Sequence, residues 1–144
     1  SFKTDAETGD PRFSSKVVER ADTTKYDGLI SNIAVSVWSG AYDPITIVRN
    51  EELVLLKAEA NIGKGGDGLT EINAVRAAHG LAATTTGGRD QLLHEKRYSL
   101  FMEGHRWVDM RRYGKTSALP NDRPARGDKV FDSFPLPEAE TKGK

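Results

Sequence analysis

The segments NEELVLLKAEANI (residues 50–62) and GLTEINAVRAAH (residues 68–79) carry the strongest structural signal in the chain. Both consist of good helix formers, and their apolar residues recur every three or four positions, as on one face of an α-helix. Gly63 and Gly80 follow them directly, and glycine is common where a helix ends because it adopts the left-handed backbone without strain. Two such helices joined by a short loop form an antiparallel hairpin, as in tetratricopeptide-like repeats.

Two more helices are predicted after this hairpin. The third covers about residues 89–103, Gly104 interrupts it, and a short fourth helix covers about residues 105–113. The sequence therefore predicts an all-α fold: a tetratricopeptide-like helix hairpin plus a broken third/fourth helix, with irregular N- and C-terminal segments.

The chain on either side of these helices is polar and rich in turn-forming residues. Apolar residues alternate with smaller or polar ones within residues 29–38, which favours a short strand or an extended segment there. We therefore divide the chain into an irregular or extended N-terminal segment (1–48), a helical core (49–114) and an irregular tail that packs on the core (115–144).

The composition narrows the classes of function. The chain has 144 residues with 21 Lys+Arg and 21 Asp+Glu, so no net charge draws it to nucleic acid or to an anionic membrane. It has no cysteine, which excludes disulfide scaffolds, cysteine-based zinc sites and thiol catalysis. His79, His94 and His105 are not spaced like paired helical metal ligands. We predict no metal site and no cofactor.

Charged residues are dense between Glu95 and Arg112. Arg97 lies four residues from both Leu93 and Phe101, so it shares a helix face with two apolar side chains. A guanidinium on such a face needs a carboxylate or carbonyl partner, because an unpaired buried charge is strongly unfavourable.

We interpret this region as a structural ion-pair network. It consists of Glu95, Arg97, Glu103, Arg106 and Asp109. We expect an arginine of the network, Arg97 or Arg106, to donate to one of its carboxylates, Glu103 or Asp109, beside a buried Trp107. The alternative is an acid/base site built from the three carboxylates, Glu95, Glu103 and Asp109. The structural interpretation is favoured, because clusters of charged residues are often structural.

Trp38 and Tyr42 lie four residues apart around Ser39-Gly40. If they are exposed, the two rings can stack on a sugar, whose C–H faces suit aromatic faces. The more common outcome for such a pair is a place in the core. The pair is our candidate ligand-binding site.

Four stretches of the chain, taken in order, resemble the C-terminal region of the SusD/RagB family of nutrient-binding outer-membrane lipoproteins. They are IVRNEELVLLKAEA (47–60), LTEINAVRAAHGL (69–81), LLHEKR (92–97) continued by FMEGHRWVDMRRYG (101–114), and FPLPEAE (134–140). The run Glu-Gly-His-Arg-Trp at 103–107 is quite specific. Ser99 is a departure, because the family usually carries an acidic residue there.

The resemblance implies an α-helical binding protein that is not a hydrolase. Such proteins lie on the cell-surface side of the outer membrane and are held by a lipidated N-terminal cysteine. They cover a SusC-like TonB-dependent transporter and help to capture glycans or other nutrients. We expect this chain to be a C-terminal fragment or one chain of a split protein, with the lipid anchor missing from it. The alternative is a free-standing helical-repeat module for protein interaction.

Overall fold

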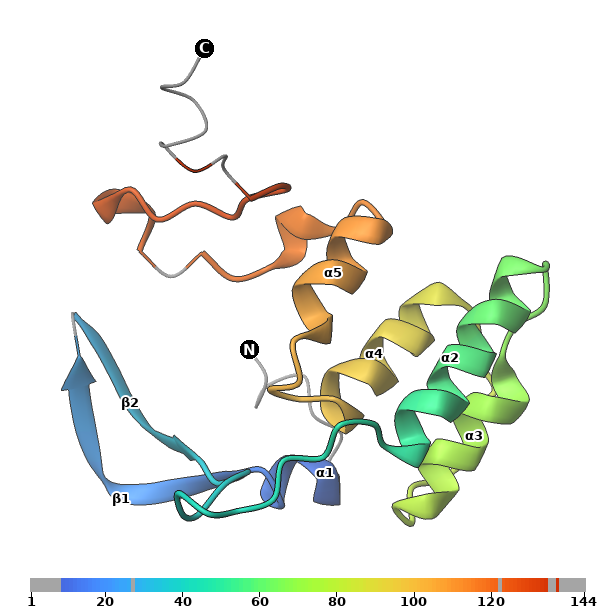
Figure 1. The fold of residues 1–144 in the computed structure, drawn as a ribbon, viewed down its shortest axis with the longest axis horizontal. Helices are drawn as coiled ribbons and strands as arrows, with labels where there is room; N and C mark the ends of the chain where they lie inside the picture. Colours follow the sequence, from blue (N-terminus) through green and yellow to red (C-terminus); the bar gives the residue numbers. More distant parts are fainter. Residues whose placement is uncertain (1–8, 27, 122, 135–136, 138–144) are drawn as a thin grey trace. The chain divides into compact units, whose positions relative to one another are not determined.

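The computed structural model describes residues 9–26, 28–121, 123–134 and 137 (Figure 1). In these ranges the helices are α1 (Pro11–Ser14), α2 (Asn50–Gly63), α3 (Leu69–Ala78), α4 (Arg89–Ser99) and α5 (His105–Arg112). The strands are β1 (Val17–Tyr26) and β2 (Leu29–Val35), and two short 3₁₀ helices are η1 (Thr116–Ala118) and η2 (Pro124–Arg126). Part of the predicted segment 1–48, and most of the tail stretch 134–140 that resembles the family, lie outside the described residues. The three-part division into 1–48, 49–114 and 115–144 stays a prediction.

The chain forms two compact units, residues 1–105 and 106–144. In the first unit, α2, α3 and α4 pack against one another, as Figure 1 shows. Buried apolar residues of these helices, with Leu100 directly after α4, form one core, and its buried members are Leu55, Ala58, Ile72, Val75, Leu92 and Leu100. The helices α2 and α3 lie where their apolar periodicity predicts them.

The prediction of an all-α fold was wrong, because β1 and β2 form an antiparallel two-stranded sheet. Val17 pairs with Val35, and the register shifts once between Glu19 and Thr24. The sequence of β1, VVERADTTKY, does not alternate between apolar and polar residues. A ribbon of two strands with solvent on both faces needs no such alternation, which explains why the pattern did not reveal β1. The strand or extended segment expected within residues 29–38 is strand β2. The fold is mixed α and β.

The third helix ends earlier than predicted. Helix α4 stops at Ser99, and a turn over residues 100–104 separates it from α5. Met102 has φ +66°, the left-handed region that non-glycine residues rarely adopt, and the backbone N–H of Glu103 donates to the carbonyl of Leu100 at 3.2 Å. This turn therefore breaks the helix four residues before the position that the sequence indicated.

The second unit contains most of α5, both 3₁₀ helices and the chain that follows. The indole N–H of Trp107 donates to the carbonyl of Phe131 at 2.7 Å, and its ring lies 4.9 Å from that of Phe134. Arg123 and Asp128 form an ion pair at 2.8 Å. Aromatic contacts and a few polar bonds thus hold this unit together. Among the described residues of the whole chain, no helix is both long and apolar enough to cross a membrane.

Candidate functional site

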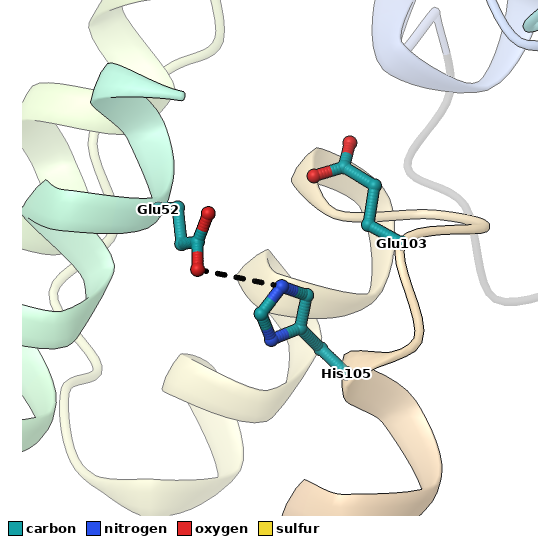
Figure 2. A group of neighbouring side chains, drawn as sticks. All are labelled: Glu52, Glu103 and His105. Carbon is teal, nitrogen blue, oxygen red and sulfur yellow. Dashed lines mark ion pairs between the residues drawn. The ribbon is translucent and has the colours of Figure 1, made fainter. Parts of the chain in front are cut away.

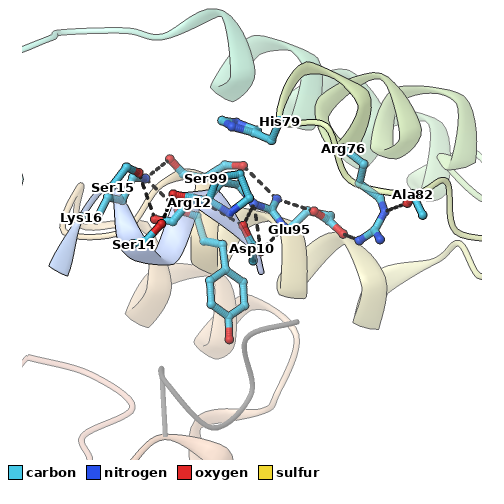
Figure 3. A network of polar contacts seen from close by, with 12 residues as sticks. Asp10, Arg12, Ser14, Ser15, Lys16, Arg76, His79, Ala82, Glu95 and Ser99 are labelled. Carbon is cyan, nitrogen blue, oxygen red and sulfur yellow. Dashed lines mark hydrogen bonds and ion pairs between the residues drawn. The ribbon is translucent and has the colours of Figure 1, made fainter. Parts of the chain in front are cut away.

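Glu95 lies at the centre of a buried charge network that joins three helices (Figure 3). One of its carboxylate oxygens accepts from Arg12 Nη1 at 2.5 Å, and the other accepts from Arg76 Nη1 at 2.8 Å and from Gln91 Nε2 at 2.7 Å. The exposed fraction of Glu95 is 0%. Because two arginines from α1 and α3 share this carboxylate of α4, the network ties the N-terminal segment to the helical core.

The Asp10 carboxylate completes the network on the other side of Arg12. It caps α1 by accepting from the backbone N–H of Arg12 at 2.9 Å, and it also accepts from the Arg12 guanidinium at 2.8 Å. Burial alone raises the pKa of the Asp10 carboxyl, but the hydrogen bonds and charge of Arg12 outweigh it and lower the pKa. The network thus contains two carboxylates, those of Asp10 and Glu95, and two guanidinium groups, those of Arg12 and Arg76, so its buried charges balance.

The C-terminal end of α4 is a second polar centre, where two cations meet. Lys16 Nζ donates to the carbonyl oxygens of Tyr98 at 2.7 Å and Ser99 at 2.6 Å, and the guanidinium of Arg49 also donates to Ser99. Arg49 forms an ion pair with Glu103 at 2.5 Å. Burial and the nearby charge of Arg49 lower the pKa of Lys16 to about 8. Cations here satisfy helix carbonyls that lack partners within the helix.

The five residues of the predicted network lie in different settings. Glu95 and Glu103 belong to the two centres just described. The Arg97 guanidinium lies 6.0 Å from the centre of the Tyr98 ring and is half-buried, as is Arg106. Asp109 is buried. Trp107, two residues before it, is half-buried, so the prediction that this side chain is buried was wrong. The predicted bond from Arg97 or Arg106 to Glu103 or Asp109 stays a prediction.

The alternative acid/base site needs two of the three carboxylates to be accessible in one cleft. Glu95 and Asp109 are both buried, and Glu95 is shared by two arginines. A carboxylate held in this way is poorly placed to exchange protons with a substrate. The geometry of Glu95 therefore favours a structural role for this carboxylate over an acid/base role.

The first turn of α2 carries two glutamates that each face a histidine. Glu51 pairs with His79 at 3.0 Å, and Glu52 pairs with His105 at 3.5 Å. Figure 2 shows Glu52 facing His105 at the start of α5, with Glu103 on the turn that precedes this helix. Ligand atoms of Glu52, Glu103 and His105 lie within 4.8 Å of one another, which is close enough to hold a small cation. Because Arg49 already neutralises Glu103, we interpret this group as an ion-pair junction.

The candidate binding residues Trp38 and Tyr42 lie on the loop between β2 and α2. The exposed fraction is 41% for Trp38 and 100% for Tyr42, so neither ring belongs to the core. Between them the chain makes a tight turn, in which the Asp43 carboxylate accepts from the backbone N–H groups of Ser39 at 2.5 Å and Gly40 at 3.0 Å. Those hydrogen bonds lower the pKa of Asp43. The turn presents two aromatic rings to solvent, the arrangement that stacking on a sugar requires.

Several residues of these centres were missed by the sequence analysis, among them Arg12, Lys16, Arg49 and Arg76. Two local signals were available. Asp10-Pro11 is a helix start, with an N-cap aspartate and proline at the first helical position. Arg76 lies four residues after the buried Ile72, which is the same spacing that drew attention to Arg97. The positions of Lys16 and Arg49 depend on contacts distant in sequence and leave no local pattern.

A comparison with protein families identifies the chain independently of this geometry. The model of the SusD family matches residues 34–142, which include α2 to α5 and the loop with Trp38 and Tyr42. Comparisons with curated proteins and with solved structures gave no match. Proteins of the SusD family are nutrient-binding components of uptake systems rather than enzymes, and the family suggests a cell-surface, outer-membrane location. The match confirms the resemblance seen in the sequence: the chain belongs to the SusD family.

Proposed function

We propose that this chain is part of a cell-surface lipoprotein that binds a glycan or another nutrient and delivers it to a SusC-like TonB-dependent transporter. Its role in this proposal is binding without catalysis, and a lipid anchor links the lipoprotein to the outer membrane. The family match over residues 34–142 is the observation that carries the proposal. A pulldown from outer membranes with the tagged chain is expected to recover a TonB-dependent transporter, and recovery of cytosolic proteins alone would contradict it.

We propose further that Trp38 and Tyr42 contact the ligand. The support is their exposure on one hydrogen-bonded turn, since exposed apolar side chains that lie close together mark interaction and ligand-binding surfaces. A glycan fits such a site because its C–H faces pack on aromatic faces while its hydroxyls stay hydrated.

Affinity electrophoresis in gels that contain soluble polysaccharides tests this site. We expect Trp38→Ala and Tyr42→Ala to weaken retention by roughly 2- to 12-fold each, the range for loss of one aromatic contact of about 0.5–1.5 kcal/mol. The matched control is Ile47→Ala, which removes an apolar side chain that is 94% exposed on the same loop. If the parent is retained and all three variants migrate like it, the ligand binds elsewhere.

A second candidate function is a protein-interaction module of helical repeats, and one observation favours it. Leu53 and Leu56 on α2 are more than half exposed, although they lie one helical turn apart on a predicted apolar face. The double variant Leu53→Ser/Leu56→Ser separates the two functions. Loss of a protein partner in this variant, with unchanged polysaccharide retention, would support the interaction module.

A further inference from the structure

The loop over residues 36–49, which carries Trp38 and Tyr42, is held at its first end by the base of the β-ribbon. The backbone N–H of Ser36 donates to the carbonyl of Lys16 at 2.8 Å, directly after the Val17–Val35 pair. The loop therefore leaves the ribbon beside Lys16.

The second end of the loop is Arg49, the residue that precedes the first turn of α2. Arg49 makes no side-chain cap to its own helix. Its guanidinium instead reaches Ser99 at the end of α4 and the carboxylate of Glu103. The loop therefore ends at the same place in the core that Lys16 contacts.

The residue that holds the first end, Lys16, and the residue at the second end, Arg49, donate to a single atom, the carbonyl oxygen of Ser99. It accepts from Lys16 Nζ at 2.6 Å and from the Arg49 guanidinium. Carbonyls in the last turn of a helix lack partners within the helix and carry partial negative charge. The same oxygen can accept two hydrogen bonds, and Glu103 offsets the repulsion between the two cations.

We propose that the Ser99 carbonyl closes the loop over residues 36–49 and that Lys16 and Arg49 are positioning residues for Trp38 and Tyr42. The inference rests on the proposed function in so far as these two rings bind a ligand. Fixing both ends of a surface loop removes much of the freedom that the loop must otherwise lose when it binds. The internal turn at Asp43 then orders the middle of the loop, while the two cations order its ends.

The experiment first measures loop order without any ligand. In a Trp107→Phe background Trp38 is the only tryptophan, so its fluorescence anisotropy reports on the loop. Lys16→Met and Arg49→Met each remove a cation and keep much of the apolar stem. We expect both to raise the local mobility of Trp38 and to speed amide exchange over residues 36–49 by about tenfold or more, as loss of a charge-assisted hydrogen bond implies.

The matched control is Lys96→Met. It removes a buried cation from the same helix, one turn before Ser99, where Lys96 pairs with Glu59 at 3.1 Å. We expect it to lower the urea midpoint of unfolding without changing exchange over residues 36–49. If the Met variants at positions 16 and 49 do not fold, Glu103→Gln is the milder test, because it removes only the charge that holds Arg49. Unchanged loop exchange in the folded variants would overturn the proposal.

Binding is then measured by retention on the polysaccharide that holds the parent most strongly. If the parent is retained, Lys16→Met and Arg49→Met should weaken retention in proportion to the time the loop spends out of place. Unchanged retention despite a loosened loop would refute their positioning role. If the parent is retained by no polysaccharide while the variants still loosen the loop, the closure stands and the function proposed for the loop fails.

Discussion

Replacement of Glu95 by Gln is the sharpest test of the buried network. The substitution keeps the size of the side chain but removes the one carboxylate that Arg12 and Arg76 share, at 2.5 and 2.8 Å. Arg12 would keep Asp10 as its counter-charge, whereas Arg76 would lose the carboxylate of Glu95 and keep its hydrogen bond to the carbonyl of Ala82. Leaving a buried charge without its partner costs about 3–5 kcal/mol.

A loss of this size is a large part of the 5–15 kcal/mol by which domains are typically stable. With a urea dependence of about 1–3 kcal/mol per molar, the midpoint of unfolding should fall by about 1 M or more. Circular dichroism of the helices during a urea titration measures it.

The control for this prediction is Glu51→Gln, which removes one partner of a half-buried pair with His79 in the same unit. Because water screens such a pair, the expected cost is at most about 1 kcal/mol. If Glu95→Gln shifts the midpoint no more than Glu51→Gln does, the network contributes no more than a surface ion pair and the reasoning fails.

Two further predictions concern single carboxylates. Asp109→Ala is expected to destabilise the protein by about 3–5 kcal/mol, because Asp109 is buried; a normal melting temperature with loss of ligand binding would show instead that the charge cluster is the binding site. The hydrogen bonds that the Asp43 carboxylate accepts in its turn lower the pKa of this carboxyl below the ordinary 3.8. The carboxylate therefore stabilises the turn fully above pH 3.8, and this stabilisation is lost as the pH falls through the lower pKa of the folded protein. In the Trp107→Phe background, the emission of Trp38 should therefore differ between the parent and Asp43→Asn at neutral pH, and the difference should vanish only below pH 3.8.

The sequence predicted the helices whose apolar residues recur at helical spacing. It missed the elements that depend on partners distant in sequence. The apolar periodicity of α2 and α3 is a property of each segment alone, so it located both helices. Strand β1 has no apolar pattern, because its hydrogen-bonding partner β2 defines it. The end of α4 was misplaced for a related reason: Lys16 and Arg49 satisfy its last carbonyls, and neither is near in sequence.

For the candidate sites too, the sequence revealed the features that depend on local spacing and missed the contacts between distant residues. The same-face argument drew attention to the charges around Arg97, and it included Glu95, which is the centre of the buried network. It did not identify Arg12 as a partner, because a contact that spans this much chain is a tertiary feature. Trp38 and Tyr42 were recognised as a pair by their spacing, but only the structure shows that both rings face solvent.

The two arginines that share Glu95 also imply an order of events in folding. Arg76 is 19 residues from Glu95 and can pair with it once α3 and α4 meet, whereas Arg12 is 83 residues away. Contacts that close long loops form late, since the chain loses more entropy in making them. We therefore expect the helices to assemble first and the N-terminal segment to dock last. In the native protein that segment should also be the first to detach, so proteases would find their earliest cleavage sites next to Asp10 and Arg12.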